Sequence, residues 1–263
     1  MICGLTAGGG LDTMRELKAR RWEAARFSAL RHRALDEARG QMDAIADAGM
    51  MPVPIVRDAS HVLAIGPRYH GRAGAELWNE PDGTVDGHVG PYTYASKVPA
   101  FVDACHACGI TPWVGVISNL NTSALDWLET MLRQVDKLSP GGLDFGVSAH
   151  IYQPPQWARF HSIRGGRPFA ITEFGYHTAP RLRVRWLPRW GWNLTRYTDA
   201  QVAELARARF AECEREGATL ACLYQYPDGP TDTAPNRFGI RRCDPATGAL
   251  TSWKPVADVV PGA

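Results

Sequence analysis

Short apolar segments that alternate with helical patterns run through the whole sequence. We expect strands at eight of them: residues 2–5, 24–30, 53–56, 75–78, 111–117, 145–150, 168–172 and 219–224. Strands that alternate with helices favour a parallel sheet with right-handed crossovers. Eight such units in 263 residues predict an α/β fold, a compact (β/α)8 barrel that forms a single domain over residues 1–263. A doubly wound open sheet is the alternative.

Apolar residues at helical spacing mark several of the connecting segments. Residues 35–48 and 125–138 carry such stripes, and residues 98–108 have an apolar helical face. Thr198 and Gln201 form a capping-box pattern at the start of residues 198–216, and Gly217 closes that segment. We also expect a final helix at residues 252–260.

A glycine-rich phosphate loop after an early strand would favour the doubly wound sheet. Gly8, Gly9 and Gly10 do follow the first expected strand. They lack the G-x-G-x-x-G spacing and the later acidic partner of a dinucleotide site. We therefore interpret them as a flexible turn, and the barrel remains the favoured fold.

The six cysteines include a C-x-x-C pair, Cys105 and Cys108, which could indicate zinc or redox chemistry. No second pair follows at ligand spacing, and the segment is helical with an apolar face. We therefore expect buried, reduced thiols, and no metal site.

Charge and hydropathy bear on partners and location. A formal net charge of +2 gives no reason to expect nucleic acid or a membrane surface. No apolar run is long enough to span a bilayer, and the N-terminus lacks the features of a signal peptide. Location stays open between the cytoplasm and a non-classical or phage-associated delivery route.

Three of the expected strands end in polar residues. Asn79 and Glu80 end the fourth strand in "AELWNEPDG", and Glu173 ends the seventh in "FAITEFGYHT". His150 and Tyr152 end the sixth in "VSAHIYQ". Because the active site of such a barrel lies at the C-terminal ends of its strands, we expect these side chains to share one mouth.

Two carboxylates across one barrel mouth suit glycoside hydrolysis. One carboxylic acid protonates the departing glycosidic oxygen while the other carboxylate attacks the anomeric carbon. This chemistry needs one protonated and one ionised carboxyl, a difference that hydrogen bonds from Asn79, His150 and Tyr152 can set. The alternative is that the glutamates are solvated surface groups and that His150 and Tyr152 only pack.

The motifs "ELWNEP", "HIY" and "TEFG", in this order on the expected strands, resemble those of glycoside hydrolase clan A, the retaining (β/α)8 glycosidases. The resemblance implies that Glu80 is the acid/base and Glu173 the nucleophile. It also implies that Asn79 binds the sugar 2-hydroxyl and that Tyr152 donates a hydrogen bond to Glu173. The implied substrate is a polysaccharide or oligosaccharide, and the mechanism requires no metal or cofactor.

Weaker correspondences extend the resemblance. Arg26 in "ARFSAL" matches the clan's strand-two arginine, with a surface ion pair as the alternative. His61 is a late candidate for a histidine near the end of strand three, and otherwise a loop histidine. Tyr224 stands near the end of strand eight, where the clan usually has tryptophan; a tyrosine can also stack on a sugar, with less area. The tail at residues 236–260 resembles clan tails, where a short hairpin precedes the last helix.

A long loop after the seventh strand, residues 177–197, mixes arginines with tryptophans. Loops of this length are usually functional or disordered. We expect a lid over the cleft in which Trp186 stacks on sugar. A packing lid with solvated arginines, or a surface for single-stranded nucleic acid or an anionic membrane, is the alternative.

Strict alternation along a strand would direct Asn79 and Glu80 to opposite faces. Both can reach the cleft only if the chain twists or bulges at the strand end, so we expect a backbone distortion there. Trp78 precedes the strand end and is expected to form barrel wall.

A non-catalytic carbohydrate-binding barrel is the alternative function.

Overall fold

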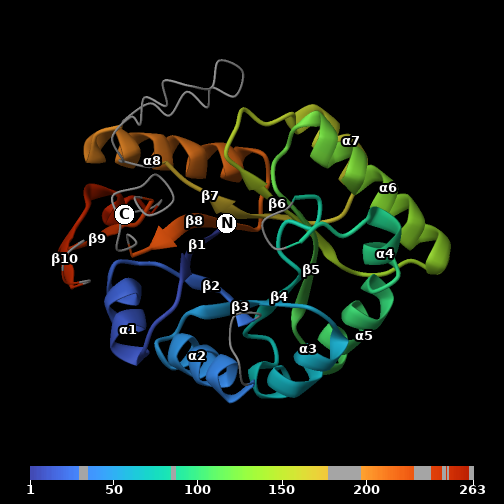
Figure 1. Cartoon of the computed structure of the whole chain (residues 1–263), viewed down its shortest axis with the longest axis horizontal. Helices are drawn as coiled ribbons and strands as arrows, with labels where there is room; N and C mark the ends of the chain where they lie inside the picture. Colours follow the sequence, from blue (N-terminus) through green and yellow to red (C-terminus); the bar gives the residue numbers. More distant parts are fainter. Residues whose placement is uncertain are drawn as a thin grey trace.

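The computed structural model describes residues 1–29, 35–83, 87–176, 197–227, 238–244, 247 and 249–260. Eight parallel strands close into one barrel in sequence order, and helices surround it (Figure 1). The strands are β1 Ile2–Ala7, β2 Ala24–Ser28, β3 Met51–Val56, β4 Gly74–Leu77, β5 Thr111–Ile117, β6 Gly146–Ile151, β7 Phe169–Phe174 and β8 Leu220–Tyr226. The (β/α)8 barrel is therefore confirmed, and the open sheet is excluded because β1 pairs with both β2 and β8.

Helices follow the strands in the described residues, and those expected at residues 35–48, 98–108, 125–138 and 198–216 are present. The helices are α1 Leu11–Ala19, α2 Leu35–Asp47, α3 Ala59–Ile65, α4 Pro91–Ala95, α5 Val98–Cys108, α6 Thr122–Leu138, α7 Trp157–Arg164 and α8 Asp199–Arg215. The capping box at the start of α8 is present, since Thr198 and Gln201 each bond the other's backbone N–H. Each expected strand overlaps an observed one, with ends that differ by at most two residues.

The expected helix at residues 252–260 is wrong. Two short antiparallel strands, β9 Arg241–Cys243 and β10 Leu250–Trp253, form a hairpin there, and only a 3₁₀ turn, Pro255–Asp258, follows. Trp253 pairs with Arg241 in this hairpin, so the first residues of the segment are already extended. Pro255 then starts the turn, where its fixed φ and missing N–H are tolerated. The hairpin itself was expected from the tail.

Apolar side chains fill the barrel interior at the N-terminal ends of the strands. These residues are Ala24, Val53, Trp113, Ala170, Leu220 and Cys222. The Trp113 indole occupies the space beside Gly146, where a Cβ would lie 2.1 Å from its ring, so glycine is required there. Because these side chains fill the N-terminal end of the barrel, polar groups lie at its C-terminal end, where the polar strand ends meet.

The six cysteines are free and buried. Cys105 and Cys108 lie on α5, where burial raises the pKa of both thiols. The expectation of buried thiols is confirmed.

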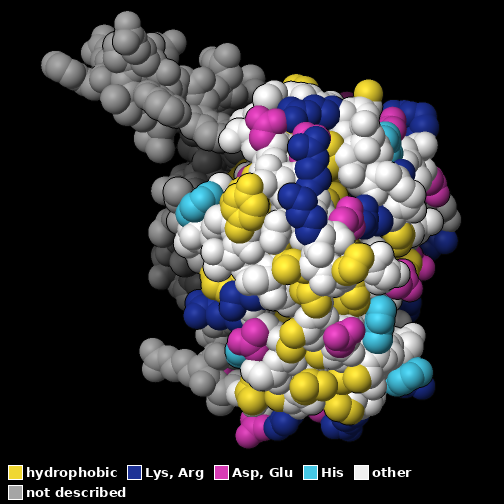
Figure 2. All heavy atoms as spheres, turned by 90° about the vertical axis from the view of Figure 1, so that its right-hand side faces the viewer, with side chains coloured by type: hydrophobic (Ala, Val, Ile, Leu, Met, Phe, Trp, Pro, Cys, Tyr) yellow, Lys and Arg dark blue, Asp and Glu magenta, His cyan; other side chains and the backbone are white. Residues whose placement is uncertain are grey.

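The outer face that carries α4 to α7 mixes basic and acidic side chains over short distances (Figure 2). This view shows no large area of one charge sign on that face. Among the described residues, none of the helices has the length and apolar character needed to cross a membrane.

Candidate active site

The backbone turns sharply where β4 ends. β4 stops at Leu77, and both Trp78 and Glu80 have positive φ, 67° and 44°. The N–H of Trp78 donates to the Val56 carbonyl at 2.7 Å, and that of Glu80 to the Val116 carbonyl at 3.1 Å. The chain is thus tied to β3 on one side and β5 on the other. The expected distortion is confirmed, and it lets two consecutive side chains reach the barrel mouth, where Asn79 contacts Arg26 and Glu80 contacts His150.

Tyr94, a fully buried residue of α4, supports this turn from behind. Its hydroxyl donates to the carbonyl of Leu77 and accepts from the N–H of Gly115, at 3.0 Å. Gly115 has φ of 101°, and Val116 beside it has φ of 39°, so β5 is irregular where it meets the turn. The Tyr94 hydroxyl therefore hydrogen-bonds two buried backbone groups, the Leu77 carbonyl and the Gly115 N–H. The irregular strand ends leave these groups outside the regular hydrogen bonding between strands.

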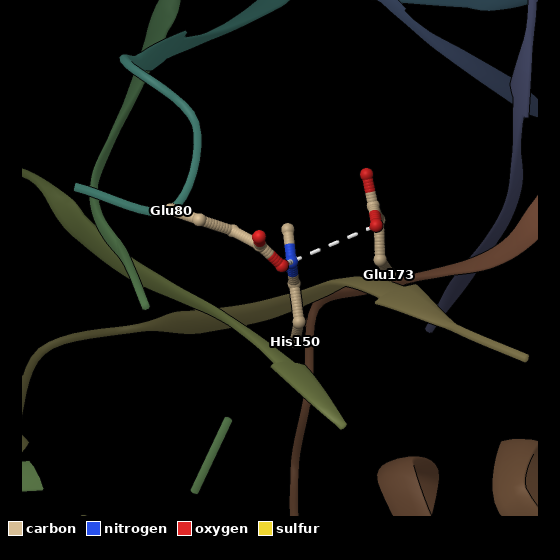
Figure 3. A group of neighbouring side chains, drawn as sticks. All are labelled: Glu80, His150 and Glu173. Carbon is tan, nitrogen blue, oxygen red and sulfur yellow. Dashed lines mark hydrogen bonds and ion pairs between the residues drawn. The ribbon is translucent and has the colours of Figure 1, made fainter. Parts of the chain in front are cut away.

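Glu80, His150 and Glu173 converge from three strand ends (Figure 3). His150 Nδ1 lies 2.8 Å from a Glu80 oxygen and 3.6 Å from a Glu173 oxygen. One oxygen of each carboxylate and a ring nitrogen all lie within 4.8 Å of one another. The two glutamates predicted as a pair are therefore neighbours at the barrel mouth.

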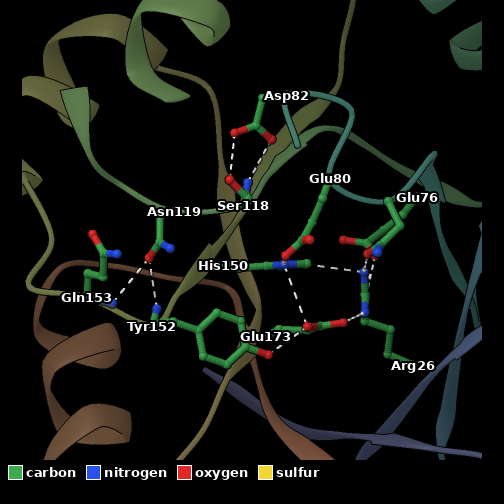
Figure 4. A network of polar contacts seen from close by, with 11 residues as sticks. Arg26, Glu76, Glu80, Asp82, Ser118, Asn119, His150, Tyr152, Gln153 and Glu173 are labelled. Carbon is green, nitrogen blue, oxygen red and sulfur yellow. Dashed lines mark hydrogen bonds and ion pairs between the residues drawn. The ribbon is translucent and has the colours of Figure 1, made fainter. Parts of the chain in front are cut away.

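Two donors hold the Glu173 carboxylate, which is buried (Figure 4). Arg26 Nη1 donates to Oε1, and the Tyr152 hydroxyl donates to Oε2 at 2.7 Å. Burial by itself raises the pKa of Glu173, but His150, Arg26 and Tyr152 together hold it below its usual value. Glu173 is thus kept ionised, as a nucleophilic carboxylate must be.

His150 is completely buried between the two glutamates. Burial lowers its pKa, but Glu173 and Glu80 outweigh burial and Arg26, so the pKa lies above its usual value. Arg26 Nη2 lies 3.3 Å from Nε2. Because a guanidinium only donates, Nε2 accepts in the neutral ring and Nδ1–H points to Glu80.

Arg26 contacts more side chains of this network than any other residue described above (Figure 4). This buried residue reaches Glu173 through Nη1, Asn79 Oδ1 through Nη2 at 2.7 Å, and Glu76 through Nε. Burial opposes its charge, yet Glu76 and Glu173 raise the pKa of the guanidinium. The surface ion pair considered for Arg26 is wrong, because its side chain is only 1 % exposed.

The role of Glu76 was not predicted from the sequence. This residue lies inside β4 with no exposed surface and pairs with Arg26. Two charged residues in the middle of apolar strands, "ARF" and "AEL", are a signal that could have found the pair, because buried charges are almost always partnered.

Side chains of the β5–α6 region fix the rim of the mouth. The Asp82 carboxylate accepts from the N–H and hydroxyl of Ser118, at 2.8 and 2.7 Å. Asn119 Oδ1 accepts from the N–H groups of Tyr152 and Gln153, at 2.9 and 3.2 Å. These contacts fix the backbone that carries Glu80 on one side and Tyr152 on the other (Figure 4).

A cleft of about 370 Å³ opens beside Glu173, on the side of β1, β2 and β8. Its lining includes Gly8, Gly9, Arg26, Ser28, Gln41, Asn79, Glu173, Tyr224 and Gln225. Asn79 and Glu173 thus face a common space that a small sugar unit can enter.

Solved structures resemble this barrel along its whole length, whereas no protein-family model and no curated protein matches the sequence. A GH128 (subgroup II) endo-β-1,3-glucanase from Sorangium cellulosum aligns over 100% of both chains, with a TM-score of 0.68 and 14% identity. An endo-β-1,4-glucanase from Xanthomonas axonopodis pv. citri aligns over 95% of both chains, with a TM-score of 0.57 and 13% identity.

A third neighbour is a GH5 xyloglucan-specific endo-β-1,4-glucanase from a metagenomic library, in complex with cellotriose. It aligns over 97% of this chain and 87% of its own, with a TM-score of 0.61 and 13% identity. The chain has the (β/α)8 fold of clan A-type glycoside hydrolases. The clan A resemblance read from three short motifs is confirmed at the level of the fold.

The weaker clan A correspondences have different outcomes. Tyr224 lines the cleft, with its ring 6.5 Å from that of Tyr152, so a tyrosine does occupy the strand-eight side of the site. His61 lies in the first turn of α3, where its ring contacts Asp58 at 3.1 Å. Its contacts with Asp58 belong to the start of α3 and involve none of the site residues.

Two tryptophans, Trp78 and Trp186, were expected near the site. Trp78 is half-buried against the core and has the Arg57 guanidinium 5.5 Å from its ring, in agreement with a role as barrel wall. Trp186 and the expected lid at residues 177–197 lie outside the described residues, apart from Tyr197.

Glu80, His150 and Glu173 are also a donor set that could hold a cation, since their atoms lie so close. Among the described residues they form the one such group of three or more.

Proposed function

We propose that this chain is a retaining glycoside hydrolase that cleaves the O-glycosidic bonds of a polysaccharide or oligosaccharide. The single observation that supports it best is the approach of the Glu80 and Glu173 carboxylates, with oxygens within 4.8 Å of each other. Retaining enzymes have carboxyl groups about 5–5.5 Å apart, whereas inverting enzymes need about 6.5–9.5 Å to admit a water between them. The separation supports a direct attack by carboxylate.

In the first step Glu173 attacks the anomeric carbon, and the glycosidic C–O bond breaks. Glu80 gives its proton to the departing oxygen, which leaves as an alcohol. The product of this step is a glycosyl ester of Glu173. The contacts from Arg26 and Tyr152 support this role, because they keep Glu173 ionised and fix its orientation.

In the second step Glu80, now a carboxylate, takes a proton from water while that water attacks the anomeric carbon. The ester bond to Glu173 breaks, and the sugar leaves with its original anomeric configuration. The Nδ1–H of His150 supports Glu80 in this role, since it can donate to the carboxylate form of Glu80. The exposed fraction of the Glu80 side chain, 14%, allows a water to reach it.

Asn79 is proposed to bind the sugar. Its Oδ1 accepts from Arg26 and its side chain lines the cleft, so the orientation of the amide is set and Nδ2 is the atom that can donate to a hydroxyl. The structural neighbours are named as β-1,3- and β-1,4-glucanases, which makes β-glucans and aryl β-glucosides the first substrates to test.

The test is a screen of the wild type, Glu173→Ala and Glu80→Gln against aryl glycosides and soluble glucans. We expect turnover by the wild type and its near-complete loss in Glu173→Ala. Glu129→Gln is the matched control, because this residue of α6 pairs with Arg133 on the surface. Full activity in Glu173→Ala would overturn the proposal. Tight glycan binding by a wild type that cleaves nothing would instead favour a carbohydrate-binding barrel.

A further inference from the structure

Glu76 is a buried carboxylate for which the two-carboxylate mechanism has no use. Its side chain has no exposed surface, and it lies four residues before Glu80 inside β4. Oε2 accepts from Arg26 Nε, whereas Oε1 has no hydrogen-bond partner among the residues that the structure describes. A charge held in this way is costly unless its partner compensates for it, so Arg26 must contribute most of that compensation.

The Arg26 guanidinium divides its donors among four different side chains. Nε goes to Glu76, Nη1 to Glu173, and Nη2 to both Asn79 and His150. A guanidinium paired with one carboxylate usually makes two parallel bonds to it. Here Glu173 receives a single bond from Arg26, so its other oxygen, Oε2, remains for Tyr152.

We propose that Glu76 is a positioning residue for catalysis. It holds Nε of Arg26, keeps the guanidinium in single contact with Glu173, and shares the cationic charge between two carboxylates. The proposal rests on the proposed role of Glu173 as nucleophile.

The physical consequence concerns the reactivity of Glu173. If Glu76 carried no charge, Arg26 would act on Glu173 alone and would stabilise its anion more strongly. A more stabilised carboxylate is a weaker nucleophile, and it is protonated only at lower pH. Removing the Glu76 charge should therefore reduce turnover and extend the acidic limb of the pH profile downward.

Other ionisable groups surround this pair and stay in place in the experiment. They are Glu80 beyond β4, His150 on β6, Tyr152 directly after β6, Cys222 and Tyr224 on β8, and Tyr94 on α4. Burial raises the pKa values of Cys222 and Tyr94, so both remain neutral across the pH range tested. The substitution changes none of these groups, so Glu76 is the variable in the comparison with the wild type.

The experiment compares kcat, KM and the pH dependence of kcat/KM for the wild type and Glu76→Gln on the best aryl glycoside from the screen. Glutamine keeps an acceptor for Arg26 Nε and removes only the charge. We expect kcat to fall about 10-fold, the scale of one charge-assisted hydrogen bond, with KM within about threefold. The acidic limb should move to lower pH by about half a unit or more.

Glu76→Asp provides a second variant if Glu76→Gln does not fold. It keeps the charge but withdraws it by one methylene, so we expect a smaller loss of kcat and a smaller shift of the limb in the same direction. Leu132→Ala, a buried residue of α6 outside the site, is the stability control. It should lower the melting temperature and leave the acidic limb unchanged.

An acidic limb at the wild-type pH in the soluble Glu76 variants would overturn the proposal, even if kcat fell, because a merely structural role predicts that result. A wild type without activity on any glycoside would instead overturn the proposed function. If the wild type is active and the acidic limb of the Glu76 variants lies at the wild-type pH, only the role of Glu76 is overturned.

Discussion

The Tyr152 hydroxyl donates a hydrogen bond of 2.7 Å to Oε2 of Glu173. This oxygen lies on the side of the carboxylate that Arg26 does not hold, and Tyr152 is itself fixed by Asn119 through its backbone. Burial and, after it, the Glu173 charge raise the pKa of Tyr152, so the phenol keeps its proton and stays a donor. The orientation of the proposed nucleophile therefore depends on Arg26 of β2 and on Tyr152, which directly follows β6.

Tyr152→Phe should weaken catalysis and raise the pKa of Glu173. Removing a donor to a charged group costs about 1.5–3 kcal/mol, which corresponds to a loss of about 10- to 100-fold in kcat/KM. Because the lost bond stabilised the ionised form, the acidic limb of the pH profile should move upward by about one unit. Steady-state kinetics between pH 3 and 8 on a single aryl glycoside would test this. A profile that coincides with the wild type would show that the bond does not tune Glu173.

The wild-type acidic limb should lie below the ordinary glutamate pKa of 4.5, since His150, Arg26 and Tyr152 lower the pKa of Glu173. A depressed pKa contributes stability at higher pH, and both this stability and the reactive carboxylate are lost as pH falls through the folded-state pKa. Initial rates together with far-UV circular dichroism would separate titration from unfolding. A limb above pH 4.5 in the folded protein would contradict the assignment.

Glu80→Gln should discriminate between leaving groups. A general acid contributes about 10²- to 10⁴-fold, and only where the departing oxygen needs a proton. We expect losses of that size on unactivated oligosaccharides, and a much smaller effect on formation of the glycosyl-enzyme from a dinitrophenyl glycoside. Pre-steady-state release of dinitrophenol measures that step. Equal losses on both substrate types would exclude Glu80 as the acid.

Arg26→Met should be strongly destabilising, because it leaves Glu76 and Glu173 buried without their cation. Breaking one partner of a buried pair typically costs about 3–5 kcal/mol. The control is Arg133→Met, whose exposed pair with Glu129 is expected to contribute about 0.5 kcal/mol or less. Urea denaturation of both variants gives the comparison. Equal midpoints would show that Arg26 is not the balancing charge of the network.

The features that sequence predicted well are those with a local physical cause. The periodicity of apolar residues predicted the strands, and the strand ends predicted that Asn79, Glu80, His150, Tyr152 and Glu173 share one mouth. The turn after Leu77 was also predictable, because alternation alone cannot direct Asn79 and Glu80 to one cleft. The side-chain roles of these residues remain proposals.

The features that sequence did not predict depend on contacts between distant segments. The charge inside the apolar "AEL" segment indicates a buried partner, but nothing local shows that this partner is Arg26, fifty residues earlier in the chain. The anchoring of Ser118 by Asp82, and of Tyr152 by Asn119, likewise requires loops whose meeting is a property of the closed barrel. The end of the chain was misassigned because apolar residues near Trp253 fit a helix, whereas pairing with Arg241 makes them extended.

The proposed function depends most on the direct attack of Glu173 on the sugar. The most direct measurement follows the reaction of the wild type by proton NMR, on the glycoside that the screen identifies, before the product anomers equilibrate. A covalent intermediate on Glu173 predicts that the first product has the anomeric configuration of the substrate. A first product of the opposite configuration would contradict the account, because a single displacement by water would then have occurred.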